Sequence, residues 1–315
     1  MLSRVAESFF WLGRNVERAE AVARVLDVNY SRAMELSARR PARAERLWHS
    51  VMECAGFAGP ASSIEGRTAS ECLRHCAFDP KNPSSIVSTV RIARANALGI
   101  RSELTMEVWE TINVLYLHVE RQNARGVARE GPSKFLRRVR DWMQSVGGIA
   151  DSTMTHGDGW HFLQTGRFLE RAYMTARIVE AVDMSLEGWR ESQRLLEMCC
   201  ASVPFVQASH RSPEALDAVQ FIALSADFPR SLRFCVREMD SAMHRISGNP
   251  EGTFGSPAER RLGRLRAVFD FTSIDEIATA GVRTFASNVR RELELLSHDV
   301  EHAYFPRLAV AALGA

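Results

Sequence analysis

Four charged residues recur at the same spacing in two segments of this sequence. The segment GRNVERAEAVAR, at 13–24, carries Arg14, Glu17, Arg18 and Arg24. The segment GRFLERAYMTAR, at 166–177, carries Arg167, Glu170, Arg171 and Arg177 at the same positions. An α-helix turns by about 100° per residue, so each set of charges lies on one helix face, opposite an apolar stripe. Guanidinium and carboxylate groups on one face can pair with each other or bind an anionic ligand.

The neighbours of these charges differ between the two segments, whereas the charges themselves do not. Asn15 corresponds to Phe168, and Glu20 corresponds to Tyr173. A solvated helix face accepts most polar residues interchangeably, so we expect instead a buried or cleft-lining Arg/Glu network. Each glutamate is accompanied by three arginines, which leaves guanidinium donors for an anionic ligand. An ordinary exposed face and a packing clamp are the alternatives.

The clamp and the anion site predict different effects of replacing Arg18 or Arg171 with alanine. If the arginines are clamps, the replacement leaves a buried glutamate unpaired and lowers stability strongly. If they line an anion site, the replacement costs little stability and abolishes binding. The excess of arginine over glutamate favours the second outcome.

Two further segments place polar residues where helices are expected to begin. The segments NPSSI (82–86) and DFPRSL (227–232) read as helix N-termini, whose free N–H groups are either capped by side chains or available to an anion. The helix expected after the first of them carries an arginine beside Glu, Asn and Trp residues, as the wall of a cleft would. These segments add five candidate ligand-binding residues to the eight repeated charges: Ser84, Ser85, Arg94, Arg230 and Ser231.

The sequence does not predict a metal site or a cofactor site. The segment HDVEH (298–302) places two histidines one helical turn apart, and Cys72 and Cys76 have the same spacing, but no further ligand can be named for either pair. The two lysines, Lys81 and Lys134, lie outside any GxxxxGK motif, which excludes a lysine-dependent phosphate loop. We therefore expect neither a bound metal nor a cofactor.

The composition is that of an ordinary globular protein. The net charge of 315 residues is only +2, so there is no overall electrostatic case for nucleic acid as a partner. No apolar run approaches the roughly 20 residues that a membrane helix needs, and the N-terminus lacks the layout of a secretory signal. We expect a cytoplasmic protein that binds neither nucleic acid nor membrane.

Apolar residues at three- and four-residue spacing predict an all-α protein. Alternating strand patterns are few, and segments rich in Gly, Pro, Ser and Asn separate the helical patterns. The expected breaks are 56–66, 78–85, 123–133, 146–159 and 247–257. The expected helices are 3–37, 42–55, 68–77, 84–123, 133–146, 159–200, 214–225, 230–247, 257–270 and 274–304.

The repeated segments also indicate how the chain is organised. GRNVERAEAVAR and GRFLERAYMTAR are offset by about half the chain, and NPSSI and FPRSL form a second related pair. We therefore expect one domain over 1–315, built from two related halves at about 1–146 and 147–315. Two copies are too few for a solenoid, so an internally duplicated helical bundle, with a pseudo-two-fold relation between the halves, is the expected architecture.

The same segments resemble those of the bacterial alpha-E domain family, all-helical proteins with a repeated Glu-Arg motif. The likeness is carried by LSRVAESFFWLGRNVERAEAVARVLD, ARANALGIRSELTMEVWETIN, GWHFLQTGRFLERAYMTARIVE and DFPRSLRFCV, and it covers nearly the whole chain. The family's motif falls on Glu17, Arg18, Glu170 and Arg171. One departure is Gln164-Thr165, where the first copy has the more usual Trp11-Leu12.

The resemblance implies a setting for the function. Members are typically encoded beside a circularly permuted ATP-grasp ligase and a transglutaminase-like peptidase, which implies a role in making or modifying amide bonds. We therefore expect an accessory binding module that holds an anionic peptide, small molecule or partner surface for the ligase. The alternatives are an enzyme that uses Glu17 or Glu170 in acid/base chemistry and a purely structural scaffold. A glutamate paired with arginines has a lowered pKa and is a weak base, which disfavours the enzyme.

Overall fold

A computed structural model describes residues 1–56, 66–182, 188–210 and 212–306. Every regular element in these ranges is helical, which confirms the predicted all-α fold. None of the described helices combines the length and the apolar character needed to cross a membrane.

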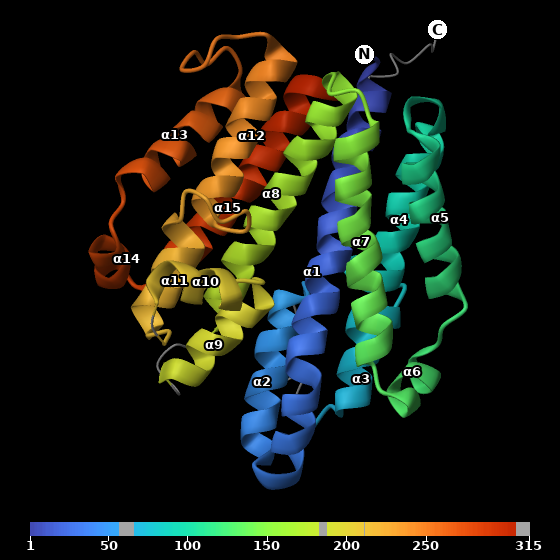
Figure 1. Ribbon diagram of the computed structural model, residues 1–315, viewed down its shortest axis with the longest axis vertical. Coiled ribbons are helices and arrows are strands. Elements are labelled where there is room, and N and C mark those ends of the chain that lie inside the picture. Colours follow the sequence, from blue (N-terminus) through green and yellow to red (C-terminus); the bar gives the residue numbers. More distant parts are fainter. Residues whose placement is uncertain (57–65, 183–187, 211, 307–315) are drawn as a thin grey trace, which may run out of the picture.

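Two long parallel helices form the centre of the molecule (Figure 1). They are α1 (Ser3–Arg39) and α8 (Asp158–Ala181), which pack against each other along most of α8. The helices α4 (Ile86–Gly99) and α7 (Ser133–Thr153) pack on α1. The helices α12 (Leu232–Ser247) and α15 (Val282–Tyr304) pack on α8 in the corresponding way.

The outer helices follow the same order on both sides. Helix α5 (Met106–Glu120) covers α4 and α7, and α13 (Pro257–Phe271) covers α12 and α15. The shorter elements are α2 (Pro41–Cys54), α3 (Ala69–Leu73), the π-helix η2 (Arg74–Phe78), the 3₁₀ helix η3 (Arg101–Glu103), α6 (Ala124–Glu130), α9 (Gly188–Met198), α10 (Ser202–Ser209), α11 (Ala215–Leu224) and α14 (Ile274–Ala280). The described helices thus pair alike in both halves, while duplication as the origin of this order stays a prediction.

Several predicted helix boundaries are wrong. The helix expected over 84–123 is two helices, because the backbone becomes extended at Leu104 and Thr105 and lets α5 fold back on α4. The break expected at 123–133 contains α6, whose first turn is capped by the side chain of Asn123. Helix α7 continues to Thr153, so the expected division of the halves at residue 146 falls inside a helix.

Further differences occur in the second half. The helix expected over 274–304 is divided at Gly281, whose φ of 88° is accessible mainly to glycine. The helix expected over 159–200 ends at Ala181 and resumes at Gly188, and α10 was not predicted. Most of the break expected at 56–66 lies outside the described residues.

The predicted apolar stripe of the first repeated segment is buried. Leu12, Val16, Ala19, Ala23 and Leu26 are at most 2% exposed and belong to one continuous core. Amphipathic spacing therefore places this face of α1 against its neighbours and leaves the charged face to meet α8.

Two glycines allow α1 and α8 to approach closely. A Cβ atom on Gly13 would lie 2.2 Å from the carbonyl oxygen of Leu163, and one on Gly166 would lie 2.0 Å from that of Phe10. Both obstacles are backbone atoms, which cannot move away as the end of a flexible side chain can. The glycines that begin the two repeated segments are therefore required by the helix crossing.

We predict that Gly13→Ala and Gly166→Ala each lower the free energy of unfolding by about 3 kcal/mol or more, because a methyl group would force the helices apart. The matched control is Gly148→Ala on α7, where a Cβ atom would meet no other atom within 4 Å. This control should leave stability unchanged or raise it slightly, since alanine favours helix. Chemical unfolding followed by circular dichroism measures all three, and equal stabilities would contradict the prediction.

Candidate functional site

Helices α1 and α8 exchange glutamate–arginine pairs at their crossing. Arg18 of α1 donates two hydrogen bonds to Glu170 of α8, from Nε to Oε1 at 2.6 Å and from Nη2 to Oε2 at 2.9 Å. Arg171 of α8 donates to Glu17 of α1 in return, from Nε to Oε2 at 3.1 Å and from Nη2 to Oε1. Both glutamates are buried, so the network that the repeated charges predict is present inside the molecule.

A second arginine supports each of these glutamates. Arg14 donates from Nε to Glu170 at 2.7 Å and from Nη1 to the hydroxyl of Ser297 at 2.6 Å. Arg167 has its Nε 3.6 Å from Glu17 and donates from Nη1 to Gln164 at 2.9 Å. Each buried carboxylate therefore faces two guanidinium groups from the opposite central helix.

The electrostatic environment keeps both glutamates ionised. Burial alone would raise the pKa of Glu17, but Arg171, Arg230 and Arg167 outweigh it and lower the pKa to about 2. Burial opposes the same effect at Glu170, where Arg18 and Arg14 lower the pKa. Because such carboxylates hold protons poorly near neutral pH, neither residue is suited to act as a general base or acid.

The last arginines of the two segments differ in their surroundings. Arg24 pairs with Glu20 one turn before it, and Glu20 also lies 3.0 Å from Arg230. Arg177 donates to the backbone carbonyl of Glu53 at 2.6 Å and lies 5.6 Å from the ring centre of Tyr173. Within the described part of the chain, no carboxylate lies within 4 Å of Arg177.

A cavity of about 460 Å³ opens beside this network, between α1, α8 and α15. Four of the candidate residues line it together: Arg14, Arg18, Ser84 and Arg177. The rest of its wall consists of Trp11, Val22, Ala55, Gly56, Tyr173, Met174, Arg290, Glu294, Ser297 and Glu301. Whether these residues bind a ligand stays a prediction.

Sequence reasoning missed the contribution of α15 to this cavity. Arg290 and Glu294 are one helical turn apart and pair at 2.8 Å, and Glu294 accepts a hydrogen bond from Tyr173 at 3.0 Å. The four-residue spacing was a visible signal for the pair. Its position against α8 depends on tertiary packing, which no motif of the sequence encodes.

The other candidate residues are not brought into this cavity. Ser85 and Ser231 cap α4 and α12 by accepting hydrogen bonds from the amides of Ser88 and Phe234. Arg94 donates to Asn113 at 2.9 Å in the interface of α4 and α5. Arg230 pairs with Glu20 of α1 and does not line this cavity. Helix capping and packing therefore account for these four residues. For Ser85 and Ser231, capping is one of the two roles that their position at a helix N-terminus predicts.

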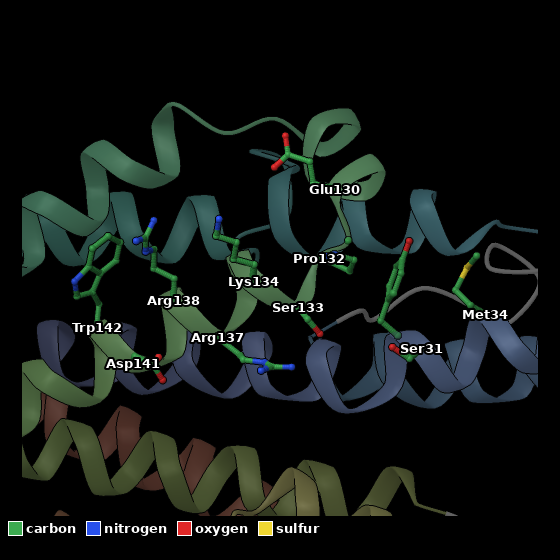
Figure 2. A pocket seen from close by; sticks show the side chains of 12 residues that line it. Ser31, Met34, Glu130, Pro132, Ser133, Lys134, Arg137, Arg138, Asp141 and Trp142 are labelled. Atoms are coloured by element: carbon green, nitrogen blue, oxygen red, sulfur yellow. The ribbon is translucent and has the colours of Figure 1, made fainter.

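A larger hollow, about 990 Å³, lies elsewhere, between the end of α1 and the start of α7. Figure 2 shows Lys134, Arg138 and Trp142 on α7 and Ser31 and Met34 on α1 around it. Its basic side chains are accompanied by Glu130 and Asp141, and it contains none of the repeated charges. We therefore place the candidate site in the cavity of about 460 Å³ between α1, α8 and α15, which contains Arg14, Arg18 and Arg177.

The potential metal ligands do not assemble into a centre. Across residues 1–56, 66–182, 188–210 and 212–306, no three His, Cys, Asp or Glu side chains are grouped as a metal site requires. His298 and His302 lie with ring centres 4.1 Å apart. Cys72 and Cys76 are free and buried.

The repeated Glu-Arg pair also has a counterpart among known proteins. A family model described as a predicted alpha-helical domain with a conserved ER motif matches residues 1–305. One protein of Mycobacterium bovis and two of Mycobacterium tuberculosis strains, each described only as uncharacterized, are 22% identical over 308 residues. The match covers 89% of this chain and 34% of each relative, so the chain spans about a third of their length. No solved structure matches the chain.

The lowered pKa of Glu17 predicts how stability changes in acid. Its pKa is about 2 in the folded protein and near 4.5 in the unfolded chain, so its ionised form stabilises the fold above about pH 4.5. This contribution, about 3 kcal/mol, is lost as the pH falls to 2. The stability difference between the natural protein and Glu17→Gln should shrink by that amount over this range.

Urea unfolding at a series of pH values measures this difference. The matched control is Glu120→Gln, which removes the carboxylate of an exposed pair with Arg91. Its stability difference should change by less than about 1 kcal/mol with pH, because solvent screens exposed pairs. Parallel pH curves for Glu17→Gln and the natural protein would show that Glu17 is not held ionised by the network.

Proposed function

The chain belongs to the Alpha-E family, and from this premise we propose that it is an accessory binding module that holds the anionic group of a peptide, metabolite or partner protein. The binding site is the cavity between α1, α8 and α15. In this proposal the buried Glu-Arg pairs of the family's motif hold the two central helices, and the arginines beside them receive the ligand.

The observation that carries this proposal is that Arg177 lines the cavity and has no carboxylate partner among the described residues. In the first segment Glu20 lies four residues before Arg24 and pairs with it. In the second segment the corresponding residue is Tyr173, which supplies a ring and a hydroxyl but no carboxylate. Arg177 therefore lines the cavity with guanidinium donors that a ligand carboxylate or phosphate can satisfy.

Two further arginines contribute positive charge to the wall of the cavity. Arg14 and Arg18 both line it and share the single carboxylate of Glu170 behind them. A guanidinium removed from water is costly unless its donors are satisfied. An anion beside Arg18 and Arg177 can accept hydrogen bonds from their guanidinium groups as it leaves water.

The alternative functions account for less of the structure. An enzyme that used Glu17 or Glu170 would need a carboxylate that exchanges protons near neutral pH, and both pKa values are lowered. A pure scaffold accounts for the exchanged pairs and for the close glycines. It leaves unexplained why a cavity lined by arginines lies directly beside them.

The proposed partners follow from the family resemblance. An ATP-grasp ligase and a transglutaminase-like peptidase remain the proposed partners, with a cytoplasmic location. The mycobacterial relatives are about three times as long as the region that they share with this chain. A domain that is one part of a longer protein is consistent with an accessory role, because the remaining length can hold the other components.

We predict that one substitution in the cavity wall weakens ligand binding by giving Arg177 a carboxylate partner from the protein itself. Tyr173→Glu places a carboxylate one turn before Arg177, as Glu20 is placed before Arg24, and it should weaken ligand binding at least tenfold. Tyr173→Phe, the matched control, keeps the ring and adds no charge, so it should bind as the natural protein does. Isothermal titration with tetraalanine, a short peptide with a free carboxylate, measures both, and thermal unfolding verifies that the variants are folded.

Two outcomes would contradict this function. One is the absence of tetraalanine binding to the natural protein. The other is equal affinity in the natural protein and in a folded Tyr173→Glu variant, which would mean that the peptide carboxylate does not meet Arg177.

A further inference from the structure

The cavity also holds an unpaired negative charge. Glu301 of α15 accepts a hydrogen bond from the hydroxyl of Ser297 at 3.0 Å. In the described residues no Arg, Lys or His nitrogen lies within 4 Å of its carboxylate. Glu301 lines the same cavity as Arg177, so the cavity wall carries two charges of opposite sign that have no ionic partner among the described residues.

These two charges lie toward opposite ends of the cavity. Helix α15 runs antiparallel to α8, because Arg290 pairs with Glu180 at 2.8 Å while Glu294 meets Tyr173. Arg290 and Arg177 therefore belong to the end near the C-terminus of α8. Glu301 lies at the other end, one turn beyond the Ser297 that contacts Arg14. At 1.5 Å per residue, Glu301 is about 16 Å along α15 from Arg290.

The remaining charges of the cavity are matched in number. Arg14 and Arg18 face Glu170, and Arg290 faces both Glu180 and Glu294. Counting Arg177 and Glu301, the wall and the carboxylates directly behind it carry equal numbers of positive and negative groups. A simple anion would therefore leave Glu301 unpaired, whereas a ligand with separated charges of both signs satisfies both ends.

We propose that the cavity selects a zwitterionic peptide-like ligand a few residues long, with its free ammonium group at Glu301 and its free carboxylate at Arg177. This inference rests on the proposed function and specifies the ligand class. Four residues in extended conformation span about 13 Å, which fits the separation of the two ends. Within the cavity, the partly exposed rings of Trp11 and Tyr173 offer apolar surface for side chains of the ligand.

Three forms of one peptide test this inference. Tetraalanine carries both charges, N-acetyl-tetraalanine keeps only the carboxylate, and tetraalanine amide keeps only the ammonium group. The inference predicts that the natural protein binds tetraalanine at least tenfold more tightly than either capped form, as measured by isothermal titration.

A substitution at Glu301 locates the ammonium end. Glu301→Gln should lose the preference for tetraalanine over its N-acetyl form and keep the preference over the amide. The matched control is Glu292→Gln on the same helix, where the carboxylate pairs with Arg261 outside the cavity. This control should leave both preferences unchanged.

The possible failures separate this inference from the proposed function. If the N-acetyl form binds as tightly as tetraalanine and the amide does not, the ligand is a simple anion, and only the zwitterion is wrong. If the amide binds more tightly than the N-acetyl form, the cavity does not hold an anion, and the proposed function fails as well. Absence of binding by all three peptides overturns both. The comparison in the natural protein holds even if a variant does not fold.

Discussion

The structure depends on the burial of two carboxylates where the parallel helices α1 and α8 cross. A glycine on each helix allows the two backbones to come into contact there. Gly13 and Gly166 bring the backbones of α1 and α8 together, which excludes water from the crossing. A carboxylate enclosed there must meet a guanidinium group, since an unpaired buried charge is very costly. Glu17 and Glu170 each pair with an arginine of the opposite helix, so each helix carries a buried charge that the other helix helps to neutralise. This reciprocity fixes the register of the two helices more strictly than apolar packing alone.

In the proposed function, the residues that differ between the two segments give the helix crossing a role in binding. Where one segment has Glu20 beside Arg24, the other has Tyr173 beside Arg177, so Arg24 is paired within its own segment, whereas Arg177 lines a cavity and has no carboxylate within 4 Å among the described residues. Helix α15 then contributes Glu294 and Glu301 to the wall of that cavity. In this account the shared charges hold the fold, and the differing positions determine what it binds.

Much of this arrangement could be predicted from particular residues, and the rest depended on contacts between distant segments. Apolar spacing correctly predicted the buried stripe of α1, and the repeated charges correctly indicated an Arg/Glu network. The spacing could not tell that Arg18 pairs with Glu170 rather than with Glu17 beside it, because that choice is made by the packing of α8. The apolar spacing also failed to predict α6, whose first turn is capped by Asn123. It failed to predict the break before α5, because that break depends on the packing of α5 against α4. The cavity was also missed, since α15 meets α8 only in the folded chain.

Glu17 and Arg171 form a buried pair whose stabilising effect requires both partners, and a double-mutant cycle measures this dependence. The cycle compares unfolding free energies of the natural protein, Glu17→Gln, Arg171→Met and the double variant, with a parallel cycle for the exposed pair Arg91 and Glu120. We expect a coupling of about 2 kcal/mol or more for the buried pair, and a double variant that is more stable than Glu17→Gln alone. The exposed pair should couple by less than about 1 kcal/mol. Equal and small coupling in both cycles would contradict the claim that exchanged charges hold α1 and α8 together.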